Sequence, residues 1–227
     1  TIRDIAISCS NEEHLLKIVD AVNAIGGGIS VHAVTDDVLQ AHEGGKIHMK
    51  GRMEIRSLGD LRRVYTPGGA NVCEVIKNDP DQARYFTGIS NSVAIVTDGT
   101  AILGLGNIGP VAGMPVMEGK AVLFDQFAGI SGVPILLDTS DPDQVVETVK
   151  HIHKGFGGIL LEDIGSPHCF EIEERLKAEL SIPVMHDDQH GTAVVTLASV
   201  ISACQQSGVE LADSVVGQIG LGAAGLA

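Results

Sequence analysis

Apolar runs alternate with segments of helical periodicity through the second half of the chain. Asp141 and Pro142 give DPDQVVETVKHI a helix-start signal, and its apolar residues recur at helical spacing. Strands that alternate with helices predict right-handed crossovers, and therefore an α/β fold whose parallel sheet carries helices on both faces. Four near-continuous aliphatic runs are the predicted strands, namely SVAIVT from residue 92, VPILL from 133, GGILL from 157 and IPVM from 182.

Three further helices are expected between and after these strands. GKAVLFDQFAGI from residue 119 and SPHCFEIEERLKAEL from residue 166 have helical periodicity, and Ser166 and Pro167 repeat the start signal of the previous helix. GTAVVTLASVISACQQSG, from residue 191, is apolar nearly all round. We therefore expect this last helix to be buried.

The first 37 residues predict a small α+β unit of strand, helix and strand. Ser10 and Glu13 have capping-box spacing, and the glycines at 26–28 end the helix. By pattern and position the unit resembles the second half of an ACT domain, a ligand-sensing module. An ordinary packing unit without a ligand fits the same pattern. Residues 38–56 are polar and contain glycine and histidine, so we interpret them as a connector.

Composition excludes several classes of protein. A formal charge of −14 disfavours nucleic acid and anionic membranes as partners, and 3% aromatic residues leave little for base stacking. No apolar run is long enough for a membrane helix, and no signal-peptide pattern is present. The four cysteines are scattered, so free thiols in a cytoplasmic protein are expected.

Acidic residues follow the predicted strands. The C-terminal ends of parallel strands share one edge of the sheet, where ligands bind. Crowded carboxylates repel each other by roughly 4 kcal/mol per pair at about 4 Å, so the pattern predicts a hard divalent cation, Mg²⁺ or Mn²⁺. The alternative is that these acids only cap the following helices. The acids are Asp98, Asp138, Glu162, Asp163, Asp187 and Asp188.

Two histidines flank the last acidic pair. His186 and His190 lie four apart, which would align them only on a helix, whereas this stretch is expected to leave a strand and turn. We expect them to form hydrogen bonds around a metal site rather than to bind the metal.

Several long motifs, in order from about residue 57 to the end, resemble those of a known family. VYTPGGANVC from residue 64, VTDGTAILGLGNIGPVAGMPVMEGKAVLF from 96, GGILLEDI and PVMHDDQHGTA closely resemble the bacterial-type malic enzymes. Gly69 departs from the family pattern, in which valine is expected, and this loosens the backbone near Tyr65. Ala101 stands where eukaryotic members carry a substrate-binding arginine, which bacterial-type members also lack.

The resemblance implies oxidative decarboxylation of L-malate to pyruvate and CO₂, with reduction of NAD⁺ or NADP⁺. It makes Lys120 the general base, Tyr65 the general acid and Asp187 the carboxylate that supports the lysine. Taken singly, Lys120 would be interpreted as an exposed lysine at a helix start, and Tyr65 as a half-buried turn residue. The residues that the resemblance implies as ligands of Mg²⁺ or Mn²⁺ are Glu162, Asp163 and Asp188.

The chain ends in a glycine pattern typical of dinucleotide binding. Gly220, Gly222 and Gly225 follow an apolar run and match the fingerprint in which a tight turn receives a pyrophosphate. We interpret residues 211–227 as the start of a Rossmann domain after a substrate and metal domain at 57–210, and expect the chain to be truncated at both ends. A second glycine run at 103–110 lacks this context and is interpreted as a loop that shapes the substrate cleft.

Two functional hypotheses remain open. The chain belongs to a malic enzyme, or it is a fragment of one that either binds metal and dicarboxylate without catalysis or only decarboxylates oxaloacetate. From the resemblance we also expect a homo-oligomer, a dimer or larger.

Overall fold

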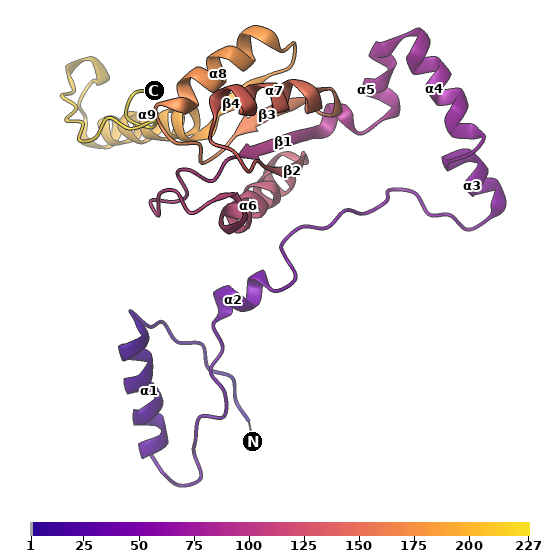
Figure 1. The fold of residues 1–227 in the computed structure, drawn as a ribbon. Coiled ribbons are helices and arrows are strands. Elements are labelled where there is room, and N and C mark those ends of the chain that lie inside the picture. The colour runs from indigo at the N-terminus through magenta and orange to yellow at the C-terminus, as the bar shows by residue number, and fades with distance from the viewer. Residues whose placement is uncertain (1) are drawn as a thin grey trace. The chain divides into compact units, whose positions relative to one another are not determined.

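The computed structural model describes residues 2–227 and divides into two compact units, Thr1–Glu43 and Gly44–Ala227. The first unit contains α1 (Glu12–Ala24) and α2 (Asp37–His42) (Figure 1). Asn11, not Ser10, caps α1, because its side chain accepts the His14 amide hydrogen bond at 2.9 Å. The strands predicted on either side of α1 do not form within the described residues. Their apolar residues, Ile5 and Ile29 among them, stay exposed without neighbouring strands to pair with.

The second unit is built on the predicted parallel sheet. Its strands are β1 (Ser92–Thr97), β2 (Ser131–Leu136), β3 (Gly158–Leu161) and β4 (Val184–His186). They pair in the order β2-β1-β3-β4, all parallel (Figure 1). The α/β fold predicted from the alternating pattern is therefore confirmed.

Alternate residues of the strands meet different helices, so both faces of the sheet are covered. On one face, Ala94 and Val96 pack in one cluster with α7 (Pro142–Ile152) and α8 (His168–Glu179). On the other face, Ile95 packs with Met117 of α6 (Pro110–Ala128). Burial of these aliphatic side chains from both faces is the main stabilising term for such a sheet.

Helix starts differ in part from the sequence prediction. Asp141 caps α7 by accepting from the Asp143 amide, as predicted. The next helix, α8, begins at His168, and no side chain caps it, so the start signal at 166 was wrong. A proline at 167 fits because the first amide of a helix has no partner inside the helix. Similarly, α6 begins nine residues earlier than the predicted start at 119.

Residues 44–91 lead from the first unit to the sheet. They contain α3 (Leu58–Val64), α4 (Gly68–Asn78) and α5 (Ala83–Phe86), with 3₁₀ turns at Pro80–Gln82 and Ile89–Asn91. The segment interpreted as a connector is attached to α6, because the Lys46 amide donates to Oε2 of Glu118 at 3.0 Å. Ile47 packs beside Met117 on the α6 side of the sheet.

The last helix corrects two predictions. α9 spans Asp187–Ser207, so the acidic pair and His190 lie in its first turn rather than in a turn before it. Its apolar side chains are not buried: Val194 and Leu197 are more than half exposed. The helix contacts the sheet at β4. No helix among residues 2–227 is long and apolar enough to cross a membrane.

The final residues carry only short elements. A 3₁₀ turn at Leu211–Asp213 follows α9, as another at His153–Gly155 follows α7. The apolar run before the glycine fingerprint does not form a strand, and Val215 and Ile219 are almost fully exposed. Since the described residues provide no adjacent strand for this segment, its backbone groups have nothing to pair with in a sheet.

Candidate metal centre

The acidic residues gather where the strand order of the sheet reverses. From β1 the chain passes through α6 to β2 on one side, and then returns through α7 to β3 and β4 on the other side. A crevice opens at such a reversal, outside the C-terminal ends of the strands. Glu162 and Asp163 directly follow β3, and Asp188 lies in the first turn of α9 after β4. Topology therefore brings the two acidic pairs together.

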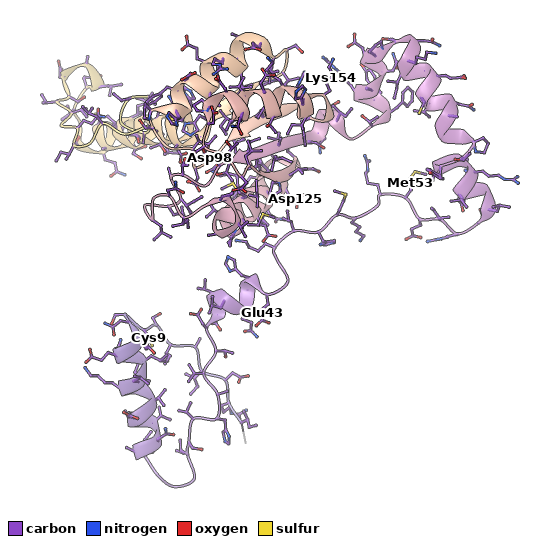
Figure 2. All side chains as sticks on the ribbon, in the orientation of Figure 1. Cys9, Glu43, Met53, Asp98, Asp125 and Lys154 are labelled. Carbon is purple, nitrogen blue, oxygen red and sulfur yellow. The ribbon has the colours of Figure 1, made fainter. Side chains whose placement is uncertain are left out.

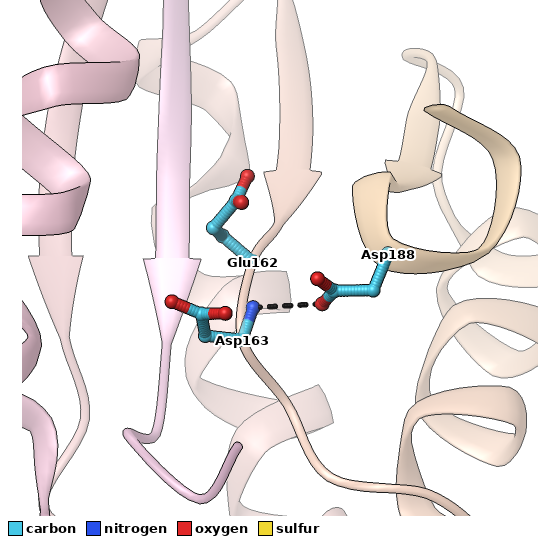
Figure 3. Close-up of side chains that lie close together, drawn as sticks. All are labelled: Glu162, Asp163 and Asp188. Atoms are coloured by element: carbon cyan, nitrogen blue, oxygen red, sulfur yellow. Dashed lines mark hydrogen bonds between the residues drawn. The ribbon is translucent and has the colours of Figure 1, made fainter. Parts of the chain in front are cut away.

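Three carboxylates face one point. Glu162, Asp163 and Asp188 each offer an oxygen, and these atoms all lie within 4.8 Å of one another (Figure 3). Glu162 and Asp163 are buried, at 5% and 3% exposure. Oε2 of Glu162 and Oδ2 of Asp163 have no aligned hydrogen-bond partner. Buried carboxylate oxygens without partners are costly unless a cation neutralises them, so the donor set fits a hard divalent ion.

Asp163 is held in an unusual backbone conformation by bonds on three sides. Its φ is +55°, in the left-handed region that side-chain-bearing residues rarely adopt. Its N–H donates to Oδ2 of Asp188 at 3.0 Å, a bond drawn in Figure 3, and its carbonyl accepts from the Ala101 amide at 3.0 Å. Its carboxylate accepts from the Leu103 amide. These bonds fix the direction of the carboxylate and offset the local strain.

The crowding of the acids raises their affinity for protons. Burial, reinforced by the charges of Asp187 and Asp188, raises the pKa of Glu162 to about 8, although Lys120 acts in the opposite direction. Burial and the charge of Asp188 raise the pKa of Asp163 to about 6. Both shifts have the sign expected when carboxylates are held close together in a partly dry site. A divalent cation would replace these protons.

Lys120, which lies in α6, contacts two residues of the acidic edge. Its Nζ lies 2.6 Å from Oδ2 of Asp187 and 3.3 Å from Oε2 of Glu162. Burial lowers the pKa of Lys120, but the hydrogen bond and charges of Asp187 and Glu162 outweigh it, and the net pKa is raised. Lys120 lies within α6 with its side chain 22% exposed, so it is not a solvated residue at a helix start.

A glycine makes room for the lysine's partner. A Cβ at Gly191 would lie 2.4 Å from Oδ1 of Asp187, well inside contact distance. Any side chain at this position would push Asp187 away from Lys120. Gly191 is one turn along α9 from Asp187, and the sequence alone gave no reason to distinguish it from other glycines.

Two histidines surround the site without joining the three carboxylates. His186 is fully buried, and its Nε2 lies 3.1 Å from Oδ2 of Asp188. His190 instead meets Glu173 of α8, with Nε2 2.8 Å from Oε2. The same Glu173 accepts the backbone N–H of His186 at 2.9 Å, and this bond ties the end of β4 to α8.

Other acids at the strand ends have local roles. Asp98, labelled in Figure 2, accepts from the amide and hydroxyl of Thr100 at 3.0 and 2.6 Å, so it stabilises the turn after β1. It does not cap the following helix, because α6 begins at Pro110 without a side-chain cap. Asp138 is exposed and lines a cavity of about 370 Å³ beside the start of α6. Neither belongs to the three-carboxylate group.

Tyr65 and the glycines at 220, 222 and 225 have no described hydrogen bond or ion pair with the three-carboxylate group. Tyr65 ends α3 with a side chain that is 74% exposed, so it is not the half-buried turn residue considered above. Gly220 has a φ of +104°, and the Gly225 amide donates to the Gly222 carbonyl at 3.1 Å. This hydrogen bond closes a tight turn, but no helix follows the turn within residues 2–227.

The loop after β1 supplies contacts that the sequence did not reveal. The Thr100 hydroxyl accepts from the Gly165 amide at 2.7 Å, and in this way it links the loops that follow β1 and β3. The segment expected to be a loop at 103–110 is one up to residue 109, with α6 beginning at Pro110, and Leu103 has a φ of +42°. Backbone donors such as Leu103 leave no signal in residue type, whereas the Asp-Gly-Thr sequence at 98–100 is a recognisable turn pattern.

Comparison with known proteins places the chain in a family. Residues 46–177 match the family model described as malic enzyme, N-terminal domain. NAD-dependent malic enzyme 1 of Bacillus subtilis is 70% identical over 227 residues, all of this chain and 52% of the relative. NAD-dependent malic enzyme of Geobacillus stearothermophilus is 50% identical over the whole chain and 47% of the relative.

Solved structures agree with the sequence comparison. The crystal structure of malic enzyme from Pyrococcus horikoshii superposes with a TM-score of 0.80 at 46% identity, over 84% of this chain and 45% of the other. The chain spans about half the length of the curated relatives it matches. From its sheet, its motifs and these matches, the chain belongs to the malic enzyme family.

Proposed function

We propose that this chain provides the metal-binding and proton-transfer half of an enzyme that oxidatively decarboxylates L-malate to pyruvate and CO₂ with reduction of NAD⁺ or NADP⁺. The observation that carries the proposal is the convergence of Glu162, Asp163 and Asp188 within 4.8 Å, beside a lysine that is paired with two acids. Both relatives described above are named NAD-dependent malic enzymes.

Glu162, Asp163 and Asp188 would hold Mg²⁺ or Mn²⁺. When bound, the cation would polarise the hydroxyl and adjoining carboxylate of malate and stabilise the negative charge left after CO₂ departs. The buried oxygens of Glu162 and Asp163 that have no aligned hydrogen-bond partner support this assignment, because Lys120, 3.3 Å from Oε2 of Glu162, brings one positive charge to a group of three carboxylates. NAD⁺ or NADP⁺ would accept the hydride from the carbon that bears the malate hydroxyl.

Lys120 is the proposed base for the malate hydroxyl. In the chain as described its pKa is raised, so it holds a proton until the charges around it change. A divalent cation would neutralise Glu162 and thus remove one of the two charges that keep the ammonium protonated. Lys120 would then release its proton to solvent, and Asp187 would orient the neutral amine toward the substrate hydroxyl.

Tyr65 is the proposed acid that protonates C3 of the product enolate, and this assignment rests on its place in the YTPGG motif. A phenol holds its proton at neutral pH and is therefore a competent donor. The YTPGG segment lies at the end of α3 and the start of α4, where the Gly69 amide donates to the Tyr65 carbonyl at 2.7 Å.

A direct assay tests the proposal. Full-length protein containing this chain, supplied with L-malate, Mn²⁺ and NAD⁺ or NADP⁺, should produce reduced nicotinamide and pyruvate in equal amounts. Lys120→Ala should lower this rate by a factor of about 100 or more, since it removes the base, while Mn²⁺ binding persists. Wild-type-like turnover in Lys120→Ala would remove the lysine from the chemistry.

The alternative, a fragment that binds metal and dicarboxylate without oxidising malate, is favoured for the 227 residues in isolation by one observation. Residues 214–227 form neither the strand nor the helix of a nucleotide-binding unit. Decarboxylation of oxaloacetate by the chain without nucleotide would show that the metal half works alone. Calorimetry should detect malate binding only after Mn²⁺ is added, and micromolar binding to metal-free protein would contradict the proposed chelation.

We further propose a cytoplasmic homo-oligomer, a dimer or larger. The four cysteines are free, which is the state that a reducing cytoplasm maintains. Exposed apolar side chains, such as Phe127 at 84% and Val194 at 67%, support burial of parts of the surface between subunits. Light scattering during size-exclusion chromatography tests the oligomer, and a monomer at micromolar concentration would overturn it.

A further inference from the structure

His186 occupies a position from which it can control one of the proposed metal ligands. It is the last residue of β4, and its side chain is fully buried. Its Nε2 lies 3.1 Å from Oδ2 of Asp188 but has no aligned hydrogen-bond partner. The two atoms are close enough for a hydrogen bond, although the contact is not aligned as one.

The same oxygen of Asp188 already has one donor. Oδ2 accepts from the Asp163 amide at 3.0 Å. A carboxylate oxygen has two lone-pair directions, so the amide and the imidazole together can occupy Oδ2 completely. The other oxygen, Oδ1, is then left for a cation.

We propose that His186 is a positioning residue that, together with the Asp163 amide, fixes Oδ2 of Asp188 and directs Oδ1 to the cation. The inference rests on the divalent-cation site of the proposed function. It extends that function by assigning a role to a residue outside the three ligands. Hydrogen bonds from neighbouring side chains commonly orient the ligands of a metal and tune its affinity.

Gln189 sets the proton on the imidazole. Oε1 of its side-chain amide lies 3.1 Å from Nδ1 of His186, and the residue is 8% exposed. A 180° rotation of this amide exchanges its oxygen and nitrogen without changing its shape. In the rotated orientation its NH₂ would donate to Nδ1 and leave the ring proton on Nε2. A neutral His186 can then donate to Asp188.

The backbone of His186 is fixed independently of its ring. Its N–H donates to Oε1 of Glu173 at 2.9 Å, and Glu173 is 5% exposed. Replacement of the ring should therefore leave the end of β4 in place. His190 is a natural control, because it is also a histidine bonded to a carboxylate, Glu173, yet it does not contact Asp188.

The test compares two substitutions of His186 whose side chains have similar length. His186→Gln keeps a side-chain N–H near the Nε2 position, whereas His186→Met fills similar space without a donor. The Mn²⁺ dissociation constant of the 227-residue chain is measured from the electron paramagnetic resonance of free Mn²⁺, and thermal unfolding checks the fold of each variant. We expect His186→Met to weaken binding about 10- to 100-fold, and His186→Gln and His190→Met to stay within about threefold of wild type.

Other results would overturn the role of His186. If folded His186→Met binds Mn²⁺ like wild type, or if Gln and Met weaken it equally, donation to Asp188 is not what the residue supplies. Should His186→Met fail to fold, Gln189→Met tests the same network, with a loss of about three- to tenfold expected and no change overturning it. A wild-type chain that does not bind Mn²⁺ overturns the metal site itself, and this inference with it.

Discussion

Binding of Mn²⁺ to the three carboxylates should release protons, because two of the ligands hold them tightly in the metal-free chain. The pKa of Glu162 is raised to about 8 and that of Asp163 to about 6. A cation must displace whatever protons these groups carry at the working pH. The pH dependence of metal affinity therefore follows from these two values.

The magnitude can be worked out from simple competition between protons and metal. At pH 7, Glu162 is about nine-tenths protonated and Asp163 about one-tenth, so Mn²⁺ should release roughly one proton. At pH 8, Glu162 is about half protonated and Asp163 is ionised. Between pH 8 and pH 6 the protonated fractions rise enough to weaken Mn²⁺ binding by about 100-fold.

Calorimetry in buffers with different ionisation enthalpies counts the released protons, and Mn²⁺ titrations at pH 6, 7 and 8 give the affinities. Glu162→Gln is the matched control, since it keeps the shape of the side chain but carries no titrating proton. It should bind more weakly and release close to none at pH 7. Wild-type affinity that changes less than about threefold between pH 6 and 8 would refute the account of a crowded, proton-holding site.

Three further results are expected. Gly191→Ala should lower the free energy of unfolding in urea by about 1–3 kcal/mol, because the added Cβ would lie 2.4 Å from Oδ1 of Asp187. The control Gly119→Ala in α6, where the nearest atom is Lys46 Nζ at 3.5 Å, should be neutral or stabilising, and equal effects of the two substitutions would refute the clash. Thr100→Val should lower the free energy of unfolding by about 1–3 kcal/mol, because Gly165 and Asp98 each lose their hydrogen bond to the hydroxyl. Thr100→Ser should keep most of this stability, and a valine variant as stable as wild type would contradict the link between the two loops. Metal-free protein should lose thermal stability progressively between about pH 4.5 and pH 8, because the folded-state pKa of Glu162, about 8, lies above its unfolded value of 4.5 and the folded state alone holds the proton in this range. Mn²⁺ should reverse the loss, and a flat profile would contradict the shift.

The hydrophobic pattern along the chain was enough to predict the parallel sheet and the edge at which its acidic residues gather. Four aliphatic runs separated by helical segments leave few alternatives to right-handed crossovers, and in such a sheet the acids after β3 and β4 must share one edge. The sequence pattern also located α7, because its cap, proline and apolar stripe act within a few residues. Local chemistry was sufficient wherever the relevant contacts were local.

Tertiary structure decided everything that depends on partners distant in sequence. α9 begins at Asp187 because the first turn packs at the end of β4, and only that start turns Asp188 toward Glu162 and Asp163. The exposure of the same helix farther along shows that an apolar pattern does not bury a helix unless another element covers it. The left-handed backbone of Asp163 and the space at Gly191 likewise exist only because segments far apart in sequence approach each other, and residue type alone cannot encode such an approach.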